Sequence, residues 1–430
     1  MTIKNHLLLH PYKIFFLFFI TRFLFLKITG FDNFQLQPDS IWFNDQSNEV
    51  LNGNFNLLRP LFITAPFFSY FQAFIKFIFS THWLIVLEFL QLVIASISGV
   101  YFYKLCKLIL KDESSSLISS IIFCFYPPTL WLVGTFTQDI WFQSFLIIFF
   151  YFFIKALQNN CLKNLIISAI FFSLTFLTKS HILIFSIFIP VIIYLKKNIF
   201  FYRRIKFIIL FILICFAATL PYGVYNLRVN KTYVISTNGL GGTLLVGRNE
   251  EAYLNHIKLN EITEEQKIRF RDTNYTIFKQ ISSRLKNLNP SEVQNLYLNE
   301  SIKWIMSNKK KNLELTLNHI KRFFTPGLSK YWQPYNIWLI SLIISAPLYI
   351  LAYISIIRFL IIDFRENVWI VGLALSVLIF SAIFYFSGRF RVITLEPYYI
   401  IFASYYISNV IKLFLKNFKK FEIYNTNIRK

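Results

Sequence analysis

Charged residues are scarce in this sequence of 430 residues: they make up 15% of it, whereas 56% is hydrophobic and 20% is aromatic. Soluble domains carry about 25% charged residues, so a water-soluble globule could not cover this much apolar surface. Cysteine is also rare, and its four copies lie in or beside apolar runs: Cys106, Cys124, Cys161 and Cys215. The sequence therefore indicates neither a disulfide framework nor a cysteine metal site.

The first apolar run lacks the small-residue cleavage site of a signal peptide. Lys4 and Lys13 precede it, but the run continues to about Gly30. A secretory signal has a shorter apolar core that ends at small residues. We therefore expect a retained transmembrane helix at this end of the chain.

Basic residues exceed acidic ones, and the net charge is +23. They are scattered between apolar runs, and they form no basic stripe or recognition motif of the kind that binds nucleic acid. We therefore expect no nucleic-acid partner. The orientation of the chain in the membrane is a better explanation of the basic residues.

Ten apolar runs are long enough, or nearly so, to cross roughly 30 Å of hydrocarbon. They show no period-2 alternation, which excludes a transmembrane barrel. The sequence therefore predicts an all-α polytopic membrane protein with about ten transmembrane helices. These helices are expected near residues 12 to 30, 83 to 103, 116 to 135, 140 to 157, 164 to 178, 181 to 195, 206 to 226, 336 to 357, 368 to 387 and 397 to 415.

The basic residues are distributed unevenly between alternate loops. If the N-terminus lies inside, twenty of them fall in inside segments and only five in the short outside segments. Because Lys and Arg accumulate on the cytoplasmic side, we expect both termini in the cytoplasm and the protein in the cytoplasmic (inner) membrane. Long translocated segments are exempt from this rule, so the charged segment 227–335 is placed outside.

Three parts follow from this topology. Residues 1–226 would form a transmembrane module with a first outside loop, 31–82, that is too long to be a simple connector. Residues 227–335 would form a small outward-facing soluble domain, and residues 336–430 the last transmembrane helices with a basic cytoplasmic tail. Within the first loop, Leu61 to Phe79 alternates aromatics with turn formers and predicts a helix on the membrane surface.

Acidic and basic residues collect in the short outside segments. Asp39 lies in the first outside loop, and Asp139 lies at the outside end of the fourth expected helix. Two other outside turns hold Lys179, His181, Arg389 and Arg391. Transfer of a sugar from a polyprenyl phosphate needs a carboxylate to take a proton and cations to bind the departing phosphate. Both kinds of group are predicted on one side of the membrane.

The first outside loop resembles that of the GT-C glycosyltransferases. Asp39, Phe43 and Gly53, followed by proline-rich aromatic sequence, have the spacing of the family 39 type. That family includes protein O-mannosyltransferases, lipid A aminoarabinose transferases and many bacterial sugar transferases. The resemblance implies a GT-C fold, a polyprenyl-phosphate sugar donor and Asp39 as the catalytic base.

Further matches follow in the same order along most of the chain. They are Tyr126-Pro127 with Thr137-Gln138-Asp139, Leu177-Thr178-Lys179, Pro221 to Asn230, Ile235 to Gly239, Gly247-Arg248-Asn249 and Gly388-Arg389-Phe390-Arg391 before Pro397. The chain departs from the family where Phe43 and Phe390 replace tyrosines and Lys179 replaces an arginine. Lysine lacks the bidentate fork of arginine, so these departures bear on the sugar and lipid preference more than on the reaction class.

The resemblance and the charges together suggest a role for each residue. Asp39 would be the general base of an inverting displacement, with Asp45 as the substitute acid. The donor phosphate would be bound by Lys179, Arg389 and Arg391, with His181 as a further candidate. Asp139 would either cap the start of its helix or bind an acceptor or a metal.

The expected partners are the polyprenyl-phosphate sugar donor, membrane lipids and a glycan, lipid or protein acceptor. No cofactor is required, because the six histidines show no ligand spacing. A divalent metal between Asp39 and Asp139 stays an open alternative. Two rival functions also stay open: a transporter or flippase, whose ionisable groups would lie near mid-membrane, and an oligosaccharide polymerase or ligase.

Overall fold

The computed structural model describes residues 10–30, 38–57, 65–237, 239–257, 276–285, 288–327 and 335–428. Every regular element in these ranges is an α-helix or a 3-10 helix. The first half contains α1 (Pro11–Thr29), α2 (Pro38–Leu51), α3 (Pro66–Phe79), η3 (Ser80–His82), α4 (Trp83–Leu110), α5 (Glu113–Phe125), α6 (Pro127–Gly134), α7 (Asp139–Asn159), α8 (Leu162–Thr178), η4 (Ser180–Ile187), α9 (Phe188–Leu195) and α10 (Phe201–Asn230). The second half contains α11 (Leu240–Gly247), α12 (Glu250–Ile257), α14 (Thr276–Ser282), η6 (Ser283–Leu285), α15 (Pro290–Ser307), α16 (Lys309–Phe324), α17 (Tyr335–Ile362), α18 (Phe364–Ile383), α19 (Gly388–Thr394) and α20 (Glu396–Ile428).

Within the described residues, five helical segments are long and apolar enough to cross a membrane. They are Pro66–Leu110, Asp139–Asn159, Phe201–Asn230, Trp338–Ile362 and Phe364–Ile383. A sixth is obtained if α5 and α6, which meet at a 50° bend, are counted as one span. The bend falls at Tyr126, because Pro127 disfavours helical backbone at the preceding residue.

The prediction of an all-α polytopic membrane protein is confirmed, and each of the ten predicted runs overlaps a helix or a helix pair. The number of ten spans itself stays a prediction. Some of these helices fall short by length or charge: α8 has 17 residues, and α1 carries Lys13, Arg22 and Lys27. The helix expected from Leu61 to Phe79 is present as α3, although residues 61–64 lie outside the described part.

The core of the membrane bundle is centred on α7, which packs against α4 and α8. Almost all of its side chains are buried, including Phe149 and Phe150. Because lipid is as apolar as these side chains, close packing holds such helices together more than the hydrophobic effect does. Gly99 of α4 shows this requirement, since the ring of Phe18 from α1 occupies the space that a Cβ atom would need.

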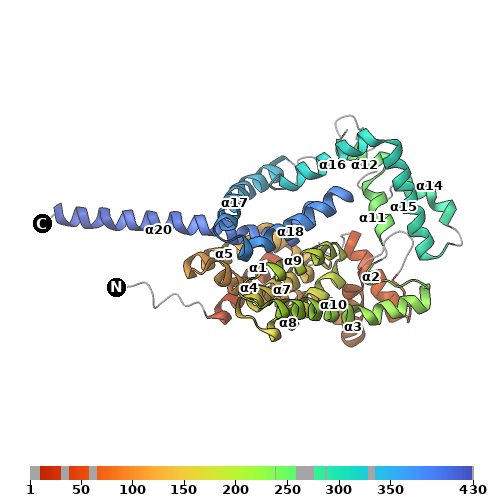
Figure 1. Cartoon of the computed structure of the whole chain (residues 1–430), viewed down its shortest axis with the longest axis horizontal. Helices are drawn as coiled ribbons and strands as arrows, with labels where there is room; N and C mark the ends of the chain where they lie inside the picture. Colours follow the sequence, from red (N-terminus) through yellow and green to blue (C-terminus); the bar gives the residue numbers. More distant parts are fainter. Residues whose placement is uncertain are drawn as a thin grey trace.

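The segment between α10 and α17 forms a group of short helices at one end of the molecule, on the right of Figure 1. It has its own small core, formed by Leu245, Phe278, Ile281, Val293 and Tyr297. The start of α15 is fixed by a capping box between Asn289 and Glu292. This group packs against the membrane bundle where α16 contacts α18. Its status as a separate soluble domain stays a prediction.

Candidate active site

One arginine joins two carboxylates that come from different helices. The Nη1 atom of Arg389 donates to Oδ2 of Asp39 at 2.5 Å, and its Nε atom pairs with Oδ2 of Asp139. The Nζ atom of Lys179 donates to Oδ1 of Asp139 at 2.6 Å. We call Asp39, Asp139, Lys179 and Arg389 the Arg389 cluster. The structure thus brings four of the predicted site residues into direct contact.

Four helix ends supply the cluster. Asp39 lies in the first turn of α2 and Asp139 is the first residue of α7, while Lys179 follows the last residue of α8 and Arg389 is the second residue of α19. Three of these placements follow the helix dipole, because unpaired N–H groups at an N-terminus favour the carboxylates of Asp39 and Asp139 and unpaired carbonyls at a C-terminus favour Lys179. Arg389 lies at the start of α19, where its two carboxylate partners hold it. Asp139 was predicted either to cap its helix or to bind an acceptor or a metal; it is the first helical residue, the N-cap position is Gln138, and its carboxylate faces two cations.

The cluster extends from the interior to the surface. The exposed fraction of the side chain is 2% for Asp139 and 12% for Lys179, but 38% for Arg389 and 49% for Asp39. Burial acts to lower the pKa of Arg389, but the carboxylates of Asp139 and Asp39 outweigh it and raise that pKa. For Lys179 burial prevails over Asp139 and lowers the pKa. Arg389 is therefore a fixed cation between an enclosed and an accessible carboxylate.

One oxygen of the half-exposed Asp39 carboxylate accepts no hydrogen bond within the described residues. Arg389 engages Oδ2, and among the described residues no donor engages Oδ1. Phe43, one turn later on α2, is buried with its ring edge against Phe68 of α3, at 5.0 Å between ring centroids. This contact holds α2 against α3 and thereby positions Asp39. It gives a packing reason for the aromatic residue four positions after the acid.

His181 lies behind the cluster and faces away from the surface. Its ring packs 4.8 Å from that of Phe142 and 5.0 Å from that of Phe390, measured between centroids. Its Nε2 atom lies 3.1 Å from Oγ1 of Thr394. Phe390 also lies 5.1 Å from the ammonium of Lys179. In this arrangement Phe390 packs between His181 and the ammonium of Lys179.

Arg391 does not join the cluster. Its side chain is 2% exposed, and it donates to the backbone carbonyls of Arg322, Phe323, Thr325 and Gly327. It also pairs with Glu396 at 3.3 Å and lies over the ring of Tyr349. Residues two apart on a helix point roughly 200° away from each other, so Arg389 and Arg391 face opposite directions. Arg391 therefore joins the end of α16 to α19 and α20.

Glu396 is a buried acid for which no role was predicted from the sequence. It accepts hydrogen bonds from the hydroxyls of Tyr126, at 2.8 Å, and Tyr349. The sequence did contain a signal for this role: Glu396 lies in the first turn of an apolar helix, and an acid that is buried there must find partners. Asp45, the predicted substitute base, is exposed on α2 and lies outside the cluster.

The residues of the cluster do not fit a metal centre. Among the described residues, no group of three or more His, Cys, Asp or Glu side chains could hold an ion. Asp39 and Asp139 do converge, but Arg389 lies between them and Lys179 pairs with the inner carboxylate. A divalent ion between the two carboxylates would have to displace Arg389 from both of them.

Comparison with known proteins identifies the architecture. Residues 63–222 match the family model described as dolichyl-phosphate-mannose-protein mannosyltransferase. Two crystal structures of the Archaeoglobus fulgidus oligosaccharyltransferase share the fold, each with a TM-score of 0.53 and 13% identity. The chain has the GT-C fold.

The two solved structures are the form tethered through a disulfide bond to an acceptor peptide containing the NVT sequon, and the apo form. They cover 93% and 96% of the GT-C chain, which in turn covers 50% and 52% of them. The GT-C chain therefore spans about half the length of these solved structures. No curated protein matches it. The segment matched by the family model holds Asp139 and Lys179, while Asp39 and Arg389 lie on either side of it.

Proposed function

We propose that the GT-C chain transfers a sugar from a polyprenyl-phosphate donor to a lipid, glycan or protein acceptor at the outer face of the cytoplasmic membrane. The observation that carries this proposal is the Arg389 cluster, in which an accessible carboxylate and two cations meet at helix ends. The mannosyltransferase family match and the GT-C fold support glycosyl transfer as the reaction class. The uneven distribution of basic residues supports an outward-facing cluster.

The reaction is a single displacement at the anomeric carbon. The acceptor oxygen forms a bond to this carbon while the bond to the phosphate oxygen breaks, and the configuration inverts. Asp39 takes the acceptor proton on the oxygen that Arg389 does not engage. The polyprenyl phosphate leaves with the electron pair of the broken bond and a growing negative charge.

Lys179 and Arg389 stabilise the departing phosphate. Positioned cations are most effective in a site with little water, and Lys179 is largely buried. Arg389 has a planar fork of donors that suits a phosphate, and part of its side chain is exposed. When the phosphate draws Arg389 toward itself, the ion pair with Asp39 weakens and the carboxylate becomes a better base.

Transfer assays with purified protein test this proposal. Radiolabelled polyprenyl-phosphate sugars are offered to the wild type, to Asp39→Asn and to Asp45→Asn, a matched control on the same helix. We expect Asp39→Asn to lose at least roughly a hundredfold in rate, because a general base contributes on this order. Asp45→Asn should retain the wild-type rate.

Two results would contradict the proposal. Equal turnover by the wild type and Asp39→Asn would remove Asp39 from the mechanism. Absence of turnover with every donor, in a wild-type protein shown to be folded, would favour transport of a lipid-linked substrate over its chemical transfer.

A further inference from the structure

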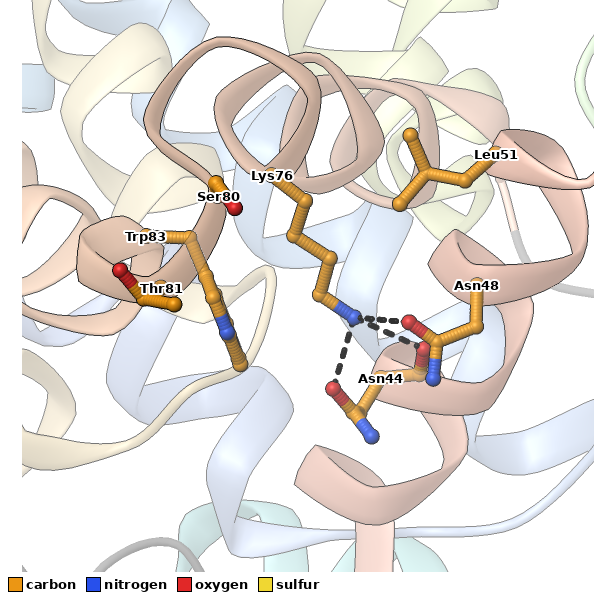
Figure 2. Close-up of a pocket in the computed structure, with 7 residues that line it drawn as sticks. All are labelled: Asn44, Asn48, Leu51, Lys76, Ser80, Thr81 and Trp83. Carbon is orange, nitrogen blue, oxygen red and sulfur yellow. Dashed lines mark hydrogen bonds between the residues drawn. The ribbon is translucent and has the colours of Figure 1, made fainter.

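A cavity of about 450 Å³ lies beside α2 and is lined by polar groups together with Leu51 and Trp83. Asn44 and Asn48 of α2 form one wall, and Lys76, Ser80, Thr81 and Trp83 form the other (Figure 2). On α2 the two asparagines are turned about 140° and 180° away from Asp39, at 100° per residue. An occupant of this cavity would therefore lie on the opposite face of α2 from the Arg389 cluster, apart from the proposed donor site.

Lys76 of α3 donates hydrogen bonds to several polar side chains of α2. Its Nζ atom donates to Oδ1 of Asn44 at 2.7 Å and to Oδ1 of Asn48 at 2.6 Å. It also donates to Oγ of Ser47 at 2.7 Å. An ammonium group has only donors, so both asparagines must present their oxygens to it and direct their amide nitrogens elsewhere. Figure 2 shows each of these nitrogens on the side of its carboxamide that is farther from Lys76.

The cavity carries the positive charge of Lys76, whose ammonium protons are already donated to oxygens of α2. Lys76 is 8% exposed, and its hydrogen bonds within the described residues all go to neutral oxygens. The hydroxyls of Ser80 and Thr81 add two further donors. Asp45 is the carboxylate that acts on Lys76 through space, but its side chain is exposed to solvent. A buried cation whose partners are neutral favours an anionic ligand.

Exposed apolar residues lie close in sequence to the residues that line the cavity. Phe77 at the end of α3 is 78% exposed, and Ile85 and Phe89 on α4 are 66% and 53% exposed. These residues belong to the candidate span Pro66–Leu110, so hydrocarbon is the solvent that suits them. The ammonium of Lys76 lies over the ring of Trp83, at 4.5 Å from the ring centroid. Tryptophan is typical of the boundary between head groups and hydrocarbon.

The backbone at the rim of the cavity has an unusual conformation. Ser80 has φ 44° and ψ −108°, which residues with a side chain rarely adopt. Such residues are concentrated at ligand-binding and switch positions, where surrounding contacts hold them in place. Here the conformation ends α3 beside Lys76 and starts η3, so that Ser80 and Thr81 line the cavity.

We propose that this cavity binds the phosphate of an anionic membrane phospholipid. The amide nitrogens of Asn44 and Asn48 donate to the phosphate, Lys76 behind them supplies the positive charge, and the acyl chains lie along Phe77 and Ile85. A bound lipid would fix α2 against α3 from the face opposite Asp39. This site is additional to the sugar donor site and does not depend on the proposed reaction.

Lipid binding to the purified full-length chain tests this inference. Native mass spectrometry compares phosphatidylglycerol with diacylglycerol of the same acyl chains, and inorganic phosphate is added as a competitor. The variants are Lys76→Gln and Asn48→Asp, of which the second keeps an oxygen for Lys76 while adding a carboxylate to the wall. Lys104→Gln is the matched control, since this lysine also lies on an aromatic ring, 5.1 Å from Tyr101, at the other end of α4.

We expect the wild type to retain phosphatidylglycerol in preference to diacylglycerol. Both cavity variants should bind phosphatidylglycerol roughly fivefold more weakly, while Lys104→Gln should match the wild type. Equal retention of diacylglycerol, or equal loss in the control, would overturn the phosphate site. Displacement of the lipid by millimolar inorganic phosphate would assign the cavity to a soluble phosphate and overturn its assignment to a lipid.

Discussion

Asp39→Asn and Asp139→Asn each remove one carboxylate from the same arginine, yet the structure predicts different outcomes. Asp139 is 2% exposed, and it is the carboxylate that pairs with Lys179. Removing one partner of a buried ion pair costs about 3 to 5 kcal/mol, because the other charge stays buried without compensation. Arg389 keeps Asp39 and is partly exposed, so we expect the lower end, about 3 kcal/mol, for Asp139→Asn.

Asp39 is 49% exposed, and its ion pair is shared with water. Pairs of this kind contribute about 0 to 1 kcal/mol, so Asp39→Asn should leave the free energy of unfolding nearly unchanged. It should nevertheless abolish sugar transfer if Asp39 is the base. Reversible unfolding in mixed micelles and the transfer assay, applied to both variants, separate the two effects. Equal destabilisation by both substitutions would show that the cluster is not assembled as described.

Three further predictions concern the surroundings of the cluster. Arg391→Lys should destabilise the protein by about 1 to 3 kcal/mol in the same unfolding assay, because one ammonium cannot reach the set of carbonyls that the guanidinium joins and a buried acceptor without a donor costs about this much. Gly247→Ala should increase proteolysis of residues 239–325, since its Cβ atom would collide with the carbonyl oxygen of Phe384; unchanged cleavage would refute that contact. Burial lowers the pKa of His256 to about 3 and that of His319 to about 2, both from 6.5. Between pH 6.5 and 3 these two histidines are therefore protonated in the unfolded chain and neutral in the folded chain. The free energy of unfolding should fall as the pH drops through this window, by up to about 1.4 kcal/mol per pH unit for each histidine. Unfolding measured at pH 7.5 and 4.5 should show a smaller difference after both histidines are replaced by Gln, and an unchanged difference would contradict the assignment.

The sequence predicted the helices well because their apolar runs need no tertiary information. Each run must form a helix if it lies in lipid, where backbone groups find no other partners. Counting alternate loops placed Asp39, Asp139, Lys179 and Arg389 on one side, and the structure brings them into contact. Their roles in transfer stay proposals. The number of membrane spans could not be fixed from apolar runs of marginal length.

Other features depend on the directions in which side chains point and on how helices pack, and a sequence pattern contains neither. Arg389 and Arg391 fall in one short motif, but the turn of α19 sends them to different neighbours. The bond from Tyr126 to Glu396 requires α20 to pack near the break between α5 and α6. The cavity at Lys76 likewise depends on the contact between α2 and α3. Sequence spacing identified the charged groups, whereas packing determines their partners.

The proposed sugar transfer requires the Arg389 cluster to open to the outside, where lipid-linked sugar donors would be presented to it. In a chain whose native cysteines are replaced, Asn52→Cys at the exposed end of α2 and Lys163→Cys on the opposite side report sidedness. We predict that an impermeant maleimide labels position 52 in intact cells and position 163 only after permeabilisation. Labelling of position 52 only after permeabilisation would contradict the account.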